Sequence, residues 1–236
     1  MTTLHVVGRR SMLKIGAGAL ASTLTGAAIS GCAPRKTDPE TTTMPKQDGR
    51  PAPNPPVPPG NTSRILLVYF SRAGENYYNG GRTNLIVGNT EVLAGMIRDR
   101  TGCDVHRIEA AEPYPDGYDA TVARNVREQN IDARPAITTP LADIGQYDTV
   151  LLASGIWNVR APMIMTTFVE SHDFTGKTIH PVTTHAMSAL GTTERDYARS
   201  CPGAVIAEGL AIRGEEVLNA GADVDSWLRR TGLLQT

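Results

Sequence analysis

The sequence has few cysteines and few aromatic residues, and it has no excess of charge of either sign. Three cysteines in 236 residues are too few for a disulfide-stapled scaffold or a four-cysteine metal site. The five histidines show no spacing typical of metal ligands, so we expect no metal site. The chain also lacks the repeats of collagen or a coiled coil and the series of long apolar segments of a polytopic membrane protein. Its length suits one ordinary domain or two very small ones.

The near-neutral total charge hides an uneven distribution along the chain. Residues 1–62 carry seven basic and three acidic side chains, a net charge of +4. The rest of the chain carries sixteen basic and twenty-one acidic side chains, a net charge of −5. Because an acidic domain repels a phosphate backbone, the sequence argues against a nucleic-acid-binding protein.

The first 31 residues have the pattern of an export signal. Arg9, Arg10 and Lys14 precede an uncharged stretch of small and mildly apolar residues over 15–31. A positive segment, an apolar segment and small residues at the end are typical of a secretory signal peptide rather than a spanning helix. The paired arginines, followed at the right spacing by Leu13 and Lys14, resemble a twin-arginine signal. A generic positive region is the alternative interpretation.

A cysteine closes this segment, and a proline-rich stretch follows. Residues 29–32, Ile-Ser-Gly-Cys, resemble a bacterial lipobox, which implies lipidation of Cys32, whereas an incidental cysteine is the alternative. Residues 32–62 contain nine of the sixteen prolines, so this stretch is expected to be an extended tether. We therefore expect a protein anchored by lipid to the outer face of the bacterial cytoplasmic membrane, or a periplasmic or extracellular one. Its membrane contact would be through the lipid alone.

Residues 63–236 alternate between strand-like and helix-like patterns. Continuous apolar runs such as Ile-Leu-Leu-Val-Tyr-Phe over 65–70 are typical of strands buried on both faces. The predicted strands are 64–71, 103–108, 149–154, 178–183 and 204–210; the predicted helices are 89–101, 118–130, 162–171, 192–199 and 217–231, with a loop over 135–146. This alternation predicts an α/β domain with a doubly wound, five-stranded parallel sheet and right-handed crossovers.

Ligands of such sheets bind beyond the carboxyl ends of the strands, where the strand order reverses. Ser71-Arg72-Ala73-Gly74 follows the first strand there, and Gly88-Asn89-Thr90-Glu91 comes next, after an insertion over 75–87. Backbone N–H groups at a helix start, together with small hydroxyl side chains, suit a phosphate group without a lysine. Alternatively, Asn89 or Thr90 is an ordinary helix N-cap.

The first strand and residues 88–91 together resemble the phosphate loop of the flavodoxin family, which wraps the phosphate of flavin mononucleotide (FMN). The resemblance extends over about residues 64–233 and implies FMN as the cofactor and a sheet of strand order 2-1-3-4-5. The insertion over 75–87 departs from the usual loop, although a subset of flavodoxin-like proteins has a comparable insertion. The implied contacts of this first loop are Ser71, Arg72, Ala73, Asn89 and Thr90.

The loops after the third and fourth predicted strands resemble the flavin-binding loops of the same family. Trp157 offers a flat apolar ring for stacking on the isoalloxazine ring, although packing beneath its own loop is the alternative. Ala186 and Ala189 stand where the family often has glycines, so neighbouring side chains would have to compensate; His185 is alternatively an ordinary polar loop residue. The implied cofactor contacts of these two loops are Ser154, Gly155, Ile156, Trp157, Asn158, Thr184, His185 and Ser188.

The remaining cysteines and the second tryptophan are predicted to be structural. In the flavodoxin strand order Cys103 and Cys201 precede opposite edge strands, roughly 19 Å apart at ~4.8 Å per strand spacing. A disulfide needs a Cα separation of at most ~7 Å, so we predict two free, buried thiols. Trp227 lies within the amphipathic last helix and is expected in the core.

The resemblance implies an exported, lipid-anchored FMN protein that exchanges electrons with a redox partner protein or a small electron acceptor. Two alternatives share the fold. One is an FMN-dependent NAD(P)H or quinone reductase, with an open pocket lined by Tyr77, Tyr78 and His185. The other is a flavin-free binding lipoprotein, consistent with the split first loop and the alanines of the third. The oligomeric state is left open by the sequence.

Overall fold

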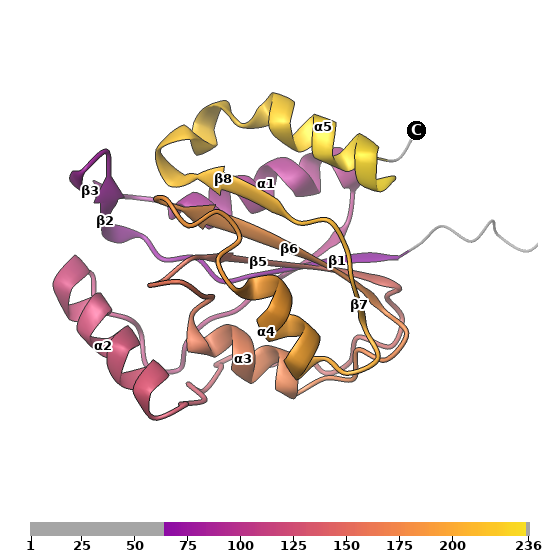
Figure 1. Cartoon of the computed structure of the whole chain (residues 1–236), viewed down its shortest axis with the longest axis horizontal. Helices are drawn as coiled ribbons and strands as arrows, with labels where there is room; N and C mark the ends of the chain where they lie inside the picture. Colours follow the sequence, from indigo (N-terminus) through magenta and orange to yellow (C-terminus); the bar gives the residue numbers. More distant parts are fainter. Residues whose placement is uncertain (1–63, 235–236) are drawn as a thin grey trace, which may run out of the picture. The chain divides into compact units, whose positions relative to one another are not determined.

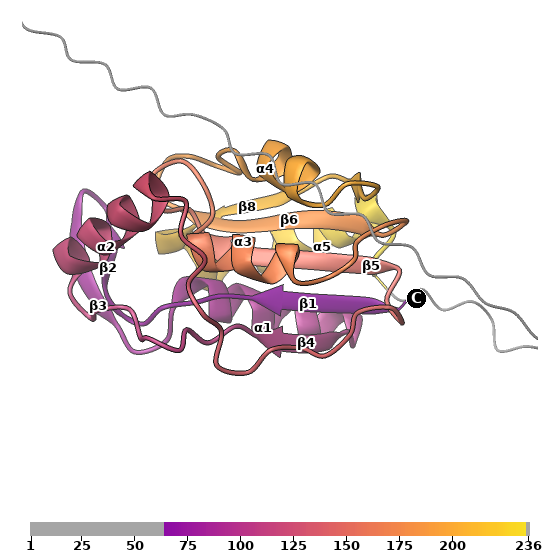
Figure 2. The same cartoon turned by 90° about the horizontal axis from the view of Figure 1, so that it is seen from below.

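The computed structural model describes residues 64–234 (Figure 1). The predicted signal peptide, the lipidation site Cys32 and the proline-rich tether lie outside the described residues. Within the described part, a parallel sheet is covered by helices on both faces, which confirms the predicted α/β class (Figures 1 and 2).

The strands of the central sheet are all parallel and follow the predicted order. From one edge to the other they run β4, β1, β5, β6 and β7, and β8 also pairs with β6; Figure 2 shows β4, β1, β5, β6 and β8 side by side. Their bounds are β1 (Ile65–Tyr69), β4 (Asp104–Arg107), β5 (Thr149–Gly155), β6 (Thr178–His185), β7 (Val205–Ile206) and β8 (Leu210–Arg213). All five residues of β1 are buried, because this central strand meets helices on both sides.

The fifth predicted strand is divided into β7 and β8 by a bulge. Residues 207–209 stand opposite only two residues of β6, His180 and Pro181. Proline has no backbone N–H to donate, so the ladder is interrupted there and the facing strand accommodates one extra residue. Gly209 allows this close approach, since a Cβ on it would lie 2.7 Å from the carbonyl oxygen of Pro181.

One face of the sheet is covered by α1 (Asn89–Thr101) and α5 (Gly221–Thr231) (Figure 1). The predicted last helix, 217–231, is in fact two elements: the 3-10 helix η1 (Gly214–Asn219) and α5, with Ala220 between them. Trp227 is fully buried in this core, as predicted, and its Nε1 donates to the carbonyl oxygen of Glu208 in the bulge at 3.1 Å.

The other face is covered by α3 (Met163–Glu170) and α4 (Thr193–Ser200) (Figure 1). Pro162 is the N-cap of α3, and Phe168 of this helix is fully buried against the sheet. The segment 135–146 has no helix or strand, as predicted; Ile137 forms one isolated bridge with Ala110.

Two elements lie beyond the carboxyl ends of the strands rather than on a face of the sheet. They are α2 (Tyr118–Asn130) and a hairpin formed by β2 (Gly74–Tyr78) and β3 (Gly81–Leu85) (Figures 1 and 2). The hairpin accounts for the insertion over 75–87. Its turn residues Asn79 and Gly80 both have positive φ, 47° and 82°, as in the two-residue turns whose twist suits a hairpin.

Both cysteines of the described residues are free thiols, which confirms that part of the prediction, whereas the predicted burial holds for only one of them. Cys201 is buried and Cys103 only partly so. Burial raises the pKa of Cys201 to about 12, so this thiol is protonated at neutral pH and unreactive. Within residues 64–234, none of the helices has the length and apolarity needed to cross a bilayer.

Candidate functional site

A cleft of about 360 Å³ opens at the carboxyl ends of β1, β5 and β6, where the sequence places the site. This volume is within the range of pockets for small organic ligands and cofactors. The walls come from the three predicted loops, from the hairpin, from α2 and from the start of η1. Of the predicted site residues, the cleft brings together Ser71, Arg72, Asn89, Thr90, Gly155, Ile156, Trp157, Asn158, Thr184 and His185.

The start of α1 forms one end of the cleft. Its N-cap is Gly88, so the interpretation of Asn89 or Thr90 as N-cap is wrong. The side-chain cap comes instead from Ser71, whose Oγ accepts the Glu91 N–H at 3.1 Å. The first turn of the helix therefore directs its remaining backbone N–H groups and its positive dipole end toward the cleft, an arrangement suited to an anion.

Two threonine hydroxyls join the first loop to the third. The Oγ1 atoms of Thr90 and Thr184 are 2.7 Å apart, and both residues are buried at the cleft. Either hydroxyl can be the donor, so the accepting one keeps its own proton for a ligand. The first and third loops thus share a polar surface in the cleft.

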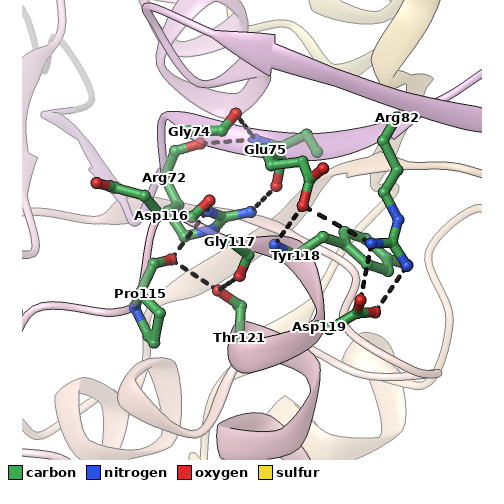
Figure 3. Close-up of polar contacts among 11 residues, drawn as sticks. Arg72, Gly74, Glu75, Arg82, Pro115, Asp116, Gly117, Tyr118, Asp119 and Thr121 are labelled. Atoms are coloured by element: carbon green, nitrogen blue, oxygen red, sulfur yellow. Dashed lines mark hydrogen bonds and ion pairs between the residues drawn. The ribbon is translucent and has the colours of Figure 1, made fainter.

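Arg72 lines the cleft, but most of its guanidinium is already engaged with backbone. Nη1 donates to the carbonyl oxygens of Pro115 (3.1 Å) and Asp116 (2.9 Å), and Nη2 donates to that of Glu75 (Figure 3). Burial lowers the pKa of Arg72, although an arginine stays charged throughout the physiological range. Arg72 was predicted to contact a phosphate. Of its guanidinium nitrogens only Nε is free of these backbone bonds, so Nε and the positive charge are what it can offer to a phosphate. Ala73, also predicted, is exposed and outside the lining.

The hairpin is fastened to the N-terminus of α2 by polar contacts. Glu75 Oε2 accepts the backbone N–H of Tyr118 at 2.8 Å, which places a carboxylate on the positive end of that helix. Arg82 donates to both carboxylate oxygens of Asp119, at 2.9 and 2.6 Å, and its guanidinium lies 4.6 Å from the centre of the Tyr118 ring (Figure 3). The hairpin and α2 consequently form one continuous wall.

The wall contributes two valines of α2 to the cleft, because part of the polar face of this helix is buried on its other side. Arg124 donates to Glu128 at 2.7 Å and lies over the Tyr114 ring, away from water. Val122 and Val126, which share the other face, remain 41% and 43% exposed and line the cleft.

Trp157 in the second loop both packs beneath the loop and lines the cleft. Its ring meets Tyr114 and Phe70 edge-on, with centroids 5.0 and 5.7 Å away. Gln129 of α2 donates to the carbonyl oxygen of Trp157 at 3.2 Å and accepts from Asn158 Nδ2 at 3.3 Å, which ties the loop to α2. Stacking of Trp157 on a flavin stays a prediction. Ser154 is fully buried with its hydroxyl near that of Tyr197, outside the lining.

The third loop retains a glycine-like backbone despite its alanines. Ala189 has φ +48° and Gly191 has φ +56°, and a Cβ on Gly191 would collide with the carbonyl oxygen of Val159. Ser188 is exposed on the outer side of this turn and does not line the cleft, although the sequence placed it there.

Replacing Ala189 with glycine is expected to raise the free energy of unfolding by about 0.5 kcal/mol. A non-glycine residue at positive φ costs roughly 1–2 kcal/mol, and the greater flexibility of unfolded glycine offsets part of the gain. Ala186, in the same loop but without positive φ, provides the control, and Ala186→Gly should lower stability. Urea unfolding of both variants would contradict this account if they were destabilised equally.

Several lining residues were not predicted from the sequence. The valines of α2 were visible as an apolar stripe on a polar helix, but nothing in the pattern shows that the stripe faces a ligand. Gly214 and Glu215 carry no signal, because they approach the cleft only through the end of β8. The unpredicted lining residues are Phe70, Asn76, Tyr118, Thr121, Val122, Asn125, Val126, Ala186, Gly214 and Glu215.

Three of the lining residues have a buried polar side-chain atom without a hydrogen-bond partner among residues 64–234. These atoms are Arg72 Nε, His185 Nδ1 and Glu215 Oε2. Burial, together with the nearby guanidinium of Arg213, lowers the pKa of His185, so its ring is neutral at neutral pH. Unpartnered buried polar groups are rare in native proteins, and their concentration here indicates that a ligand completes the site. No group of three or more potential metal ligands occurs within the described residues.

Comparisons with known proteins agree with this geometry. A family model described as flavodoxin matches residues 84–230, more than half of the chain. A solved structure from Bacteroides eggerthii, provisionally called a flavoprotein, is 27% identical with a TM-score of 0.57, covering 72% of this chain and 98% of its own. Another from Bacteroides uniformis, also provisionally called a flavoprotein, is 24% identical with a TM-score of 0.56 over 71% and 98% of the two chains. The comparison with curated proteins found no match.

Proposed function

The chain belongs to the flavodoxin family, and from this premise we propose that its cleft binds FMN and that the protein transfers electrons through it. The observation that carries the proposal is the meeting of three loops, from β1, β5 and β6, around one cleft at the switch point of the sheet. The 27% identical Bacteroides eggerthii protein, provisionally called a flavoprotein, supports a flavin as the ligand.

The residues present fit FMN at both of its ends. The start of α1, with Asn89 and Thr90, offers N–H and hydroxyl groups for a phosphate dianion. The apolar lining residues Ile156, Trp157 and Val122 offer an apolar surface for the ring system. The unpartnered polar atoms of the lining suit the polar chain that joins phosphate and ring.

Bound FMN would supply the redox chemistry, and the protein's own residues bind and orient it. The α1 terminus holds the anionic end, while the hairpin and α2 limit the access of water to the ring. Electron exchange would take place with a redox partner protein or a small acceptor. Export by the twin-arginine route and anchoring through Cys32 are part of the same proposal, since that route carries folded proteins and would permit FMN loading before export.

The test is the visible absorbance spectrum of the full chain purified from cytoplasmic expression, with mass spectrometry of any released cofactor. Stoichiometric FMN with flavin absorbance is the expected result. A colourless protein that stays colourless in excess FMN would contradict the proposal and favour the flavin-free binding lipoprotein.

A second candidate is an FMN-dependent NAD(P)H or quinone reductase. Tyr77 and His185 do line the cleft, as this alternative expects, whereas Tyr78 does not. The half-exposed Val122 and Val126 add an apolar wall that a planar aromatic substrate could contact. Sustained NADH–quinone turnover by the FMN-loaded protein would favour the reductase, and its absence would favour the electron carrier.

A further inference from the structure

Glu215 is a charged side chain at the edge of the cleft, placed there by the end of β8. It is the second residue of η1, and the preceding Gly214 lies against the start of α1: a Cβ on Gly214 would be 2.5 Å from Asn89 Nδ2. Both residues line the cleft. The absence of a side chain at 214 thus lets Glu215 approach the same polar corner as Asn89 and His185.

The carboxylate of Glu215 is buried but only half satisfied. Its side chain is 5% exposed, and one oxygen, Oε1, accepts from Arg213 Nη2 at 2.9 Å. The other, Oε2, has no hydrogen-bond partner among residues 64–234. A buried acceptor without a donor is costly, more so when charged, so native proteins rarely retain one without a reason.

The group is ionised at neutral pH. Burial opposes its ionisation, but the backbone N–H groups of Glu215 and Asn79, together with the Arg213 guanidinium, hold the pKa of Glu215 below its ordinary value. Arg213 is largely exposed, and this surface ion pair does not by itself explain why the carboxylate is withdrawn from water. Its Oε2 still has no hydrogen-bond partner among residues 64–234, and because Glu215 lines the cleft, a ligand bound there can supply a donor.

We propose that Glu215 binds the ligand of the cleft by accepting hydrogen bonds from hydroxyl groups, and that in FMN these are the hydroxyls of the ribityl chain. The inference rests on the proposed FMN function. The phosphate is excluded as the partner, because it is mostly a dianion at neutral pH and repels a carboxylate. The last torsion of a glutamate is broad and two-fold, so a small rotation brings either oxygen to a hydroxyl.

The experiment compares Glu215→Gln with Glu216→Gln in the full chain, using FMN and riboflavin as probes. Riboflavin shares the ribityl chain and ring but lacks the phosphate. Glu215→Gln should raise the Kd of both probes by a similar factor of about ten. It should leave the Tm of the flavin-free protein unchanged or higher, because glutamine removes a buried, half-satisfied charge. The exposed neighbour Glu216 is the control, and Glu216→Gln should leave both Kd values and Tm unchanged.

Three results would overturn the inference. Unchanged Kd values with a lower flavin-free Tm would make Glu215 a structural partner of Arg213 alone. Tighter binding of FMN with unchanged riboflavin affinity would place the carboxylate beside the phosphate. Failure of the wild-type protein to bind either probe would overturn the FMN function itself. This result differs from the first two results, which concern the Glu215→Gln variant.

Discussion

Replacing Gly88 with alanine is expected to lower FMN affinity about 100-fold and the free energy of unfolding by about 3 kcal/mol. An added Cβ would lie 2.5 Å from the carbonyl oxygen of Arg72 and closer still to Ser71 Oγ. Gly88 itself has an ordinary extended backbone, φ −69°, so the cost is steric rather than conformational. Relief of the collision would move residues 71–72 from the start of α1 and break the Ser71–Glu91 cap. Flavin titration and denaturant unfolding measure the two effects.

Gly95 in the same helix provides the matched control. No atom lies within 4 Å of a Cβ built on it, so Gly95→Ala should raise the free energy of unfolding by about 0.5–1 kcal/mol through helix propensity. Its FMN affinity should equal that of the wild type. Wild-type affinity in Gly88→Ala would show that the start of α1 is not where the phosphate binds.

The central sheet was predictable because its strands are buried on both faces. The runs that became β1 and β5 are continuously apolar, and only a parallel sheet between helices buries such runs completely. The position of the cleft followed from the same topology. To predict this position, it was enough that the carboxyl ends of neighbouring parallel strands lie together. This brings Ser71, Gly155 and Thr184 to one edge of the sheet.

The walls of the cleft could not be predicted, because they depend on contacts between residues far apart in the sequence. The hairpin has no apolar alternation, and its position depends on the contacts of Arg72 with the carbonyl oxygens of Pro115 and Asp116, 43 and 44 residues away. The orientation of α2 depends on the buried Arg124, which donates to the carbonyl oxygens of Glu112 and Pro113, so that a polar face of the helix turns away from water. The bulge opposite Pro181 shifts β8 along β6, and this shift determines where Gly214 and Glu215 lie.

Arg72 is expected to fasten the β2–β3 hairpin to the segment before α2, and Arg72→Lys should break this attachment. The guanidinium joins three carbonyl oxygens from two segments, those of Glu75 in the hairpin and of Pro115 and Asp116 before α2. A lysine keeps the charge, but a single ammonium lacks the planar fork that reaches all three. At roughly 1 kcal/mol or more for each acceptor left unsatisfied, we expect a loss of about 2–3 kcal/mol in the free energy of unfolding.

Hydrogen exchange distinguishes the detachment of the hairpin from general destabilisation. In Arg72→Lys, the amides of Glu75 and Tyr118, which bond across the junction, should exchange faster, while those of β1 and β5 should change only with global stability. FMN affinity should fall in parallel, because the hairpin wall limits the access of water. The control is Arg82→Lys, at an exposed ion pair with Asp119 of the same junction, and it should alter exchange little. Equal effects of the two substitutions would mean that charge alone attaches the hairpin, and that the three carbonyl contacts of Arg72 are dispensable.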